Sequence, residues 1–208
     1  MQRMIVFVLA ALLCAPFALA GEPLPAFEKY TSEGNRFRAL VPSGWTRSGR
    51  NAPYADMTPV AGARFDGPPT GESVPASIAL YWYSGEWSFT TPDSYINARL
   101  GSMVREDTER GREIAALMVA GRNAAGFRMK TFELVTLPHD RLNVGTDDGQ
   151  IVFERVAPSK KVIMEEQYVV VPATKGYFVL HYRAPESVFI LFQPIFEKVT
   201  AAFEPLVP

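Results

Sequence analysis

One predicted strand is apolar on both faces, and this restricts the fold more than any other feature of the sequence. Residues 76–83 read Ala-Ser-Ile-Ala-Leu-Tyr-Trp-Tyr. Successive side chains of a strand point to opposite faces of its sheet. Here Ile78, Leu80 and Trp82 share one face, and Ala79, Tyr81 and Tyr83 share the other. Because neither set tolerates long contact with water, we expect a sheet that is covered on both sides.

A first amphipathic helix is expected to supply one of these covers. Thr91 is a good N-cap, Pro92 suits the first helical position, and Asp93 favours the positive end of the helix dipole. Apolar residues then recur at helical spacing, which predicts one buried stripe: Ile96, Leu100, Met103 and Val104.

A second amphipathic helix is expected over about 185–203. Its apolar face consists of Val188, Phe192, Ile195, Phe196, Val199 and Phe203. Pro194 lies within this pattern and removes one backbone donor, so we expect the helix to be kinked or split there.

The remaining chain reads as strands, turns and loops. Period-two patterns or short apolar runs predict strands at 37–41, 63–66, 114–119, 126–137, 151–156, 162–171 and 177–182. The segments 48–71 and 138–149 read as loops. Strands with a few segregated helices favour α+β packing over alternating βαβ units. We therefore expect a three-layer α/β/α sandwich, with a central, mainly antiparallel sheet and a helix on each face.

The N-terminal segment predicts export. Arg3 precedes an apolar run over 5–13, and Ala18-Leu19-Ala20 places small residues where signal peptidase reads them. The run is too short for a membrane span, which needs about 20 residues. A lipidated Cys14 would require a small residue before it, but Leu13 stands there. We expect cleavage after Ala20 and a single periplasmic or secreted domain over 21–208.

Net charge and composition exclude some classes of partner for the mature domain. Removing residues 1–20 takes away Arg3 and leaves 20 basic against 22 acidic side chains, a net charge near −2. This balance argues against nucleic acid and gives no strong attraction to an anionic membrane. The mature chain also contains no further membrane span and no cysteine, so its core must hold the fold without disulfides.

The layout resembles the PsbP-like family, which is named for an extrinsic subunit of photosystem II. Three stretches carry the resemblance: Tyr30 to Trp45 with its Val41-Pro42-x-x-Trp45 turn, the strand 78–83 followed by Thr91-Pro92-x-x-Tyr95, and 168–184 before a Phe-rich helix. The family also includes bacterial periplasmic proteins and a eukaryotic Ran-binding branch. The resemblance implies a small antiparallel sheet between helices that serves as a binding or assembly module. It implies no catalytic residues.

Aromatic residues near the central strand are the candidate binding residues. Trp87 follows the strand between Glu86 and Ser88, two residues after Gly85. It either caps the core or, together with Tyr83, contacts a protein partner or small ligand.

A metal site is the alternative. His139, Asp140, Asp147 and Asp148 fall in the predicted 138–149 loop. Such ligands suit Ca²⁺, Mn²⁺ or Zn²⁺, although their spacing matches neither an EF-hand nor H-E-x-x-H. Asp147-Asp148-Gly149 also reads as an ordinary turn.

No arrangement in the sequence indicates catalysis. His181 reads as a hydrogen-bonded histidine at the edge of a core, and no G-x-S-x-G accompanies it. Glu165 and Glu166 point to opposite faces of a strand, so they cannot act as an acid–base pair, and we interpret them as edge charges. The sequence therefore favours a non-enzymatic binding or accessory protein of the cell envelope. The alternative is a metal-binding protein or metal-dependent hydrolase that uses the 138–149 loop.

Overall fold

The computed structural model describes residues 24–49, 59–85, 91–101, 115–136, 141–147, 150–156 and 159–207. The N-terminal elements are β1 (Phe27–Thr31), η1 (Glu33–Asn35), β2 (Phe37–Pro42), β3 (Thr46–Ser48), β4 (Ala61–Asp66), β5 (Ser77–Ser84) and α1 (Pro92–Gly101). The C-terminal elements are β6 (Ala115–Val119), β7 (Arg122–Thr136), β8 (Arg141–Asp147), β9 (Gln150–Val156), β10 (Ser159–Ala173), β11 (Gly176–Pro185), η2 (Glu186–Val188), α2 (Phe189–Ala201) and β12 (Glu204–Pro205).

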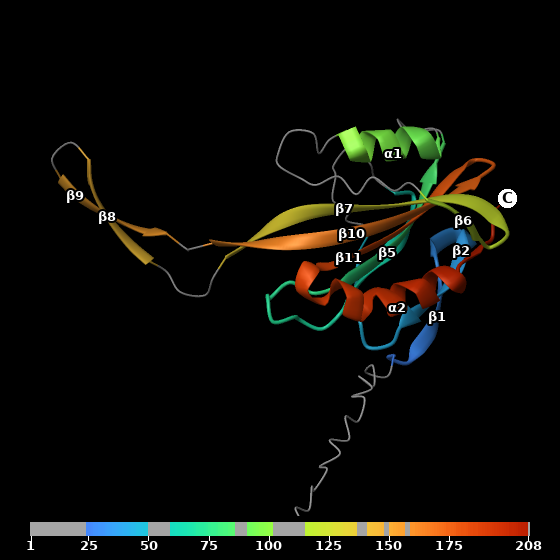
Figure 1. Cartoon of the computed structure of the whole chain (residues 1–208), viewed down its shortest axis with the longest axis horizontal. Coiled ribbons are helices and arrows are strands. Elements are labelled where there is room, and N and C mark those ends of the chain that lie inside the picture. The colour runs from blue at the N-terminus through green and yellow to red at the C-terminus, as the bar shows by residue number, and fades with distance from the viewer. Residues whose placement is uncertain are drawn as a thin grey trace, which may run out of the picture.

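A seven-stranded sheet forms the centre of the molecule (Figure 1). Its order is β3-β4-β5-β11-β10-β7-β6, and its neighbouring strands all pair antiparallel. Gly176 opens β11 at a φ of 149°, where a Cβ atom would lie 2.0 Å from the carbonyl oxygen of Tyr83. Only glycine therefore allows β5 and β11 to pair this closely after the hairpin turn.

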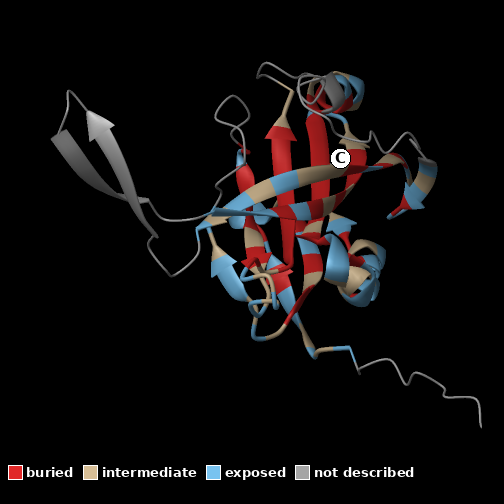
Figure 2. Ribbon diagram, turned by 60° about the vertical axis from the view of Figure 1, so that its left-hand side comes forward, coloured by how far each residue is buried: buried red, intermediate tan, exposed pale blue. Residues whose placement is uncertain are grey.

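One face of this sheet is covered by α2 together with the three-stranded sheet β1-β2-β12 (Figure 1). The cluster between these layers is aromatic: Phe37 contacts both Phe178 and Phe203, with ring centroids 5.9 and 5.3 Å apart. Tyr182 stacks on Phe196 of α2 at 5.5 Å. Figure 2 shows the central strands as the buried part of the chain. We call this side the α2 face.

The opposite face carries α1, and we call it the α1 face. Tyr95 of α1 packs against Tyr83 and Tyr177 of the sheet, with centroids 5.6 and 5.5 Å apart. The cluster under the helix also includes Ile96, which the sequence placed in the buried stripe. Met103 and Val104, from the same predicted stripe, lie outside the described residues.

The predicted sheet is confirmed, since it is mainly antiparallel and packs against two helices. Both faces of β5 are buried, as the alternation in its sequence requires. The three-layer helical sandwich is not confirmed, because strands share the outer layer with α2 and α1 has only ten residues.

Two local expectations need correction. The predicted 138–149 loop is wrong for Arg141–Asp147, which forms β8 and pairs with β9. The last helix is expected to be kinked or split at Pro194, and the split is wrong, since α2 runs through Pro194. Pro194 and Ile190 are both exposed, so water can satisfy the Ile190 carbonyl that loses its helical donor.

The predicted signal peptide, 1–20, lies outside the described residues. Among the residues that the structure describes, no helix is long and apolar enough to cross a membrane.

Candidate functional site

The strand register brings polar side chains together on the α1 face. One row across four strands joins Arg64, Ala79, His181 and Tyr168 as successive cross-strand partners. The adjacent row joins Asp66, Ser77, Arg183 and Glu166. Side chains on one face of paired strands are close neighbours, so residues more than 100 positions apart form one polar site.

Glu166 is the centre of this site. Its Oε2 atom accepts hydrogen bonds from the Tyr168 hydroxyl at 2.5 Å, from His181 Nε2 at 3.0 Å and from Arg99 Nη2 at 3.2 Å. Its Oε1 atom accepts one from the Thr131 hydroxyl at 2.7 Å and lies 3.3 Å from Arg183 Nε as an ion pair. We call these six residues the Glu166 cluster: Arg99, Thr131, Glu166, Tyr168, His181 and Arg183.

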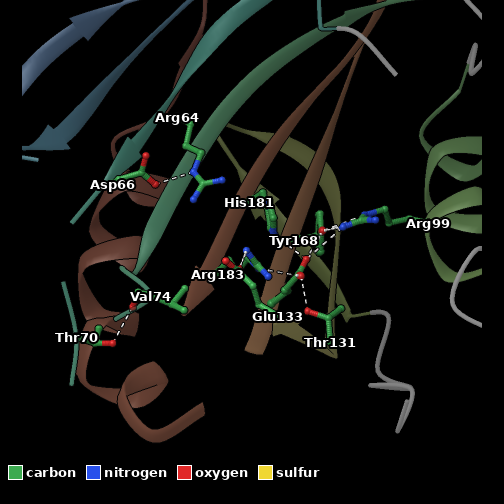
Figure 3. Close-up of polar contacts among 11 residues, drawn as sticks. Arg64, Asp66, Thr70, Val74, Arg99, Thr131, Glu133, Tyr168, His181 and Arg183 are labelled. Atoms are coloured by element: carbon green, nitrogen blue, oxygen red, sulfur yellow. Dashed lines mark hydrogen bonds and ion pairs between the residues drawn. The ribbon is translucent and has the colours of Figure 1, made fainter. Parts of the chain in front are cut away.

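Arg99 connects the cluster to α1 (Figure 3). Its guanidinium donates from Nε to the Tyr168 hydroxyl at 2.9 Å, and its Nη2 group contacts the same oxygen. The Arg99 residue is only 2% exposed. The Tyr168 ring lies between Phe127 and His181, stacked at 4.7 and 4.1 Å. Tyr168 and His181 are therefore held by ring packing as well as by hydrogen bonds.

The cluster keeps Glu166 ionised. Burial by itself raises the pKa of this carboxyl, but the hydrogen bond with His181 and the nearby charges of Arg99 and Arg183 outweigh burial. The net result is a pKa well below the usual value. With five contacts on two oxygens, the carboxylate has little capacity left to accept another donor.

His181 is held neutral by the same surroundings. Burial lowers its pKa, the hydrogen bond with Glu166 opposes that effect, and the charges of Arg99 and Arg183 add to the lowering. Since Glu166 can only accept, we assign the imidazole hydrogen to Nε2, which leaves Nδ1 without one.

A cavity of about 160 Å³ opens above this cluster. Its walls come from five strands and from α1, and we call it the Glu166 cavity. It is lined by Arg64, Ser77, Ala79, Tyr81, Arg99, Thr131, Phe132, Glu166, His181 and Arg183.

The three arginines of the cavity differ in the solvent exposure of their side chains. The side chain of Arg64 is 32% exposed, against 19% for Arg183 and 2% for Arg99. Arg64 donates from Nε to Asp66 at 2.6 Å, and Arg183 Nη1 lies 2.7 Å from Glu133 (Figure 3). Arg64 is thus the first arginine that an entering molecule meets. Arg99 lies at the buried end of the cavity beside Glu166, and we call this end the floor.

Tyr83, one of the two residues predicted to bind a partner, does not line this cavity. Tyr83 is buried in the α1-side core, stacked on Tyr177 at 5.3 Å. Trp87 lies outside the described residues.

The structure describes only one of the four predicted metal ligands. Asp147 is the last residue of β8 and pairs with Gln150, and His139, Asp140 and Asp148 lie outside the described residues. Within the described parts of the chain, no group of three or more His, Cys, Asp or Glu side chains is placed to hold a metal ion.

Three predictions about single residues have different outcomes. His181 is a hydrogen-bonded histidine at the edge of a core, as expected. The interpretation of Glu166 as an edge charge is wrong, because β10 is an inner strand that pairs with both β7 and β11. The predicted orientation of Glu165 to the opposite face is correct, since it lies 4.0 Å from Arg128 on the α2 side.

Sequence reasoning missed the arginines of the cavity. Each of them is a single cation on a different element: Arg64 on β4, Arg99 on α1 and Arg183 on β11. One usable signal was present, because Arg99 is three residues after Ile96 and therefore near its buried stripe.

Comparisons with known proteins give a likeness of fold. No family model matches the chain, and no curated protein sequence matches it. Solved structures similar to it include LpqN of Mycobacterium tuberculosis, which is described as involved in cell envelope biogenesis. That structure has a TM-score of 0.45 and 14% identity, over 86% of this chain and 90% of LpqN.

Two further similar structures come from a cyanobacterium and from Saccharomyces cerevisiae. The cyanobacterial PsbP (CyanoP) of Synechocystis sp. PCC 6803 has a TM-score of 0.43 and 11% identity, over 89% of this chain and 95% of CyanoP. The Ran-binding protein Mog1p of Saccharomyces cerevisiae has a TM-score of 0.47 and 8% identity, over 88% of this chain and 97% of Mog1p. A PsbP protein is therefore among the structures that the chain is similar to, as the sequence resemblance predicts. At these identities the function has to be argued from the side chains.

Proposed function

We propose that this protein is an exported, non-catalytic binding protein of the cell envelope, and that its small ligand enters the Glu166 cavity. The cavity itself carries the proposal. It is a partly open hollow of mixed polar and apolar surface on the sheet, and its walls come from six elements. Concave sites with a few fixed polar groups on a preformed scaffold are typical of small-ligand binding.

The protonation state and contacts of Glu166, on the floor of the cavity, favour ligand binding over catalysis. A general acid or base has to exchange a proton with its substrate near neutral pH. Glu166 does not suit that role, because its pKa is lowered and both its oxygens are already engaged. The same contacts make it a fixed anchor for Arg99 and Arg183, which are then held in position for a ligand.

The test is a pair of cavity variants compared with the unchanged protein. Ala79→Leu places a larger side chain in the cavity, whereas Ala63→Leu places the same side chain in the α2-side core on a neighbouring strand. Both substitutions are expected to destabilise the fold by about 1–3 kcal/mol through overpacking. Only Ala79→Leu should abolish ligand binding.

Binding is followed by amide chemical shifts and melting temperature, with short carboxylates, primary amides, amines, sugars and inorganic phosphate as probes. At least one class should shift the amides of Ala79 and His181 in the unchanged protein and leave them unmoved in Ala79→Leu. Equal responses in Ala79→Leu and the unchanged protein, or no response to any class, would overturn the proposed function.

Export is tested separately from ligand binding. Expression of the full chain in a Gram-negative host, followed by fractionation and mass spectrometry, should recover a periplasmic protein that starts at Gly21, with no lipid-modified species that starts at Cys14. Recovery of the uncleaved chain from the cytoplasm would contradict this part of the proposal.

A further inference from the structure

The walls of the Glu166 cavity offer a ligand more charged hydrogen-bond donors than acceptors, since the uncharged acceptors are the hydroxyl oxygens of Ser77, Tyr81 and Thr131 and Nδ1 of His181. Arg64, Arg99 and Arg183 can only donate, and Glu166, the acceptor-only residue of the lining, is saturated by five contacts. Tyr81 remains a protonated hydroxyl, because burial raises its pKa to about 12. A ligand group that fits such walls must accept hydrogen bonds, which favours an anion and disfavours ammonium groups and cations.

The charges around the cavity limit how negative that ligand can be. Each cavity arginine already has a carboxylate partner among the described residues: Asp66 for Arg64, Glu133 for Arg183 and Glu166 for Arg99. These six charges sum to zero while His181 is neutral. Since an uncompensated charge in a partly desolvated site is costly, an entering monoanion needs one additional positive charge. Protonation of His181 at Nδ1 would supply it.

Size and surface restrict the rest of the ligand. A cavity of about 160 Å³ has the volume of roughly five water molecules. Ala79 and the ring of Tyr81 contribute apolar wall beside the polar groups. This combination suits a short aliphatic tail next to a charged head.

From these observations, and resting on the proposed function, we propose that the cavity binds a small monocarboxylate together with one proton. Arg64 holds the carboxylate, and His181 takes the proton from solvent. Arg64 is suited to this role because Asp66 occupies its Nε group, and a planar guanidinium can also bind a carboxylate through its two Nη groups. Arg64 is therefore the specificity-determining residue.

His181 has to be judged against all of its charged and titratable neighbours. They are Glu166 and Tyr168 on β10, Arg183 on β11, Arg99 on α1, Arg64 on β4 and Tyr81 on β5. Among these, Glu166 favours the protonated ring, and Arg99 and Arg183 oppose it. An anion beside Arg64 shifts this balance towards protonation, so binding and proton uptake support each other.

The test uses isothermal titration calorimetry of the mature protein with acetate, butyrate and hexanoate. The matched primary amides, butylamine and inorganic phosphate serve as comparison probes. At least one carboxylate should bind at least roughly tenfold more tightly than its amide, because the amide lacks the charge that Arg64 recognises. An amide or amine that binds as tightly as its carboxylate, or a phosphate that binds more tightly than all three acids, would overturn the ligand class.

Repeating the titration in two buffers of different ionisation enthalpy measures the proton. We expect uptake approaching one proton per carboxylate, and an affinity that falls by about tenfold per pH unit as pH rises above neutrality. His181→Asn should remove both the uptake and the pH dependence. Zero uptake in the unchanged protein would remove His181 from the proposal.

Arg64→Gln should weaken carboxylate binding at least roughly tenfold, and Arg64→Lys should recover part of the loss. Arg128→Gln is the matched control, since Arg128 is a partly exposed arginine on the α2 face that lies outside the cavity. Equal losses in Arg64→Gln and Arg128→Gln would contradict the role of Arg64.

The two proposals fail in distinguishable ways. Amides or sugars that shift the amides of Ala79 and His181 without any carboxylate effect would leave the binding function standing and overturn only the ligand class. If no probe of any class moves those amides, the binding function itself is contradicted.

Discussion

The two faces of the seven-stranded sheet are stabilised by different interactions. The α2 face is a continuous apolar core, in which the rings of Phe37, Phe178 and Phe203 pack edge to face or tilted against one another. The α1 face has a smaller apolar cluster under the helix and, beside it, the Glu166 cluster with its cavity. Burial of apolar area holds the first face, and a saturated polar network holds part of the second. The comparison shows how one sheet provides a rigid scaffold on one side and a chemically specific site on the other.

The largest loss of stability is expected from removing an aromatic ring from the α2-face core. Phe178→Ala removes a fully buried ring that contacts three other aromatic rings. It should lower the free energy of unfolding by about 3–5 kcal/mol, as measured by urea denaturation. The variant protein that remains folded should still bind ligand in the cavity. Loss of binding in the folded fraction would show that the two faces are not separable.

Charge neutralisation on the α1 face is expected to cost nearly as much. Glu166→Gln leaves Arg99 and Arg183 without their shared counter-charge and should destabilise the fold by about 3 kcal/mol or more. Glu165→Gln is the control, because its 4.0 Å ion pair with Arg128 is partly exposed. It should change the free energy of unfolding by no more than about 1 kcal/mol. Similar losses in the two variants would contradict the central role assigned to Glu166.

A smaller effect is expected from removing a single hydroxyl of the network. Tyr168→Phe retains the stacked ring but removes the hydroxyl that donates to Glu166 and accepts from Arg99. The expected loss is about 1–3 kcal/mol, because a buried acceptor and a buried donor both lose a partner. Tyr182→Phe, which removes a hydroxyl bonded to the Phe189 carbonyl on the α2 face, gives a matched comparison. Because its partner carries no charge, Tyr182→Phe should cost less than Tyr168→Phe.

The smallest expected effect concerns pH. The pKa of His181 is lowered in the folded state, so its contribution to stability is present above its unfolded value of 6.5 and is lost as pH falls below that value. Among the residues described, the α2 face has no histidine. Urea denaturation at pH 7.5 and pH 5.5 should show a loss that His181→Asn reduces. An unchanged pH dependence in that variant would assign the loss to other groups.

Much of the fold follows from local sequence patterns. The double alternation in β5 and the apolar stripe of the last helix each predict which side chains are buried, and Ile78, Tyr81 and Phe196 are buried as predicted. The hairpin of β8 and β9 was partly missed, because Asn143 and Gly145 interrupt the apolar alternation and suggest a loop.

The site could be predicted only in part. The position of His181 at the edge of a core could be predicted, because the strand residues around it are apolar. The position of Glu166 could not, because a glutamate on an edge strand and one on an inner strand look alike until the neighbouring strands are known. Arg64 and Arg183 reach the same cavity only through the register of β4, β5 and β11, which no local pattern encodes.

The ionised, saturated state of Glu166 is the claim on which both the binding function and the ligand class depend. It can be measured by following the side-chain carboxyl carbon of Glu166 by ¹³C NMR during an acid titration of the folded protein. The structure predicts that this carbon remains that of a carboxylate well below pH 4.5, where an ordinary glutamate is half protonated, down to the acid at which the fold is lost. A titration midpoint at or above pH 4.5 would mean that the cavity floor is a neutral acid, and the account would be wrong.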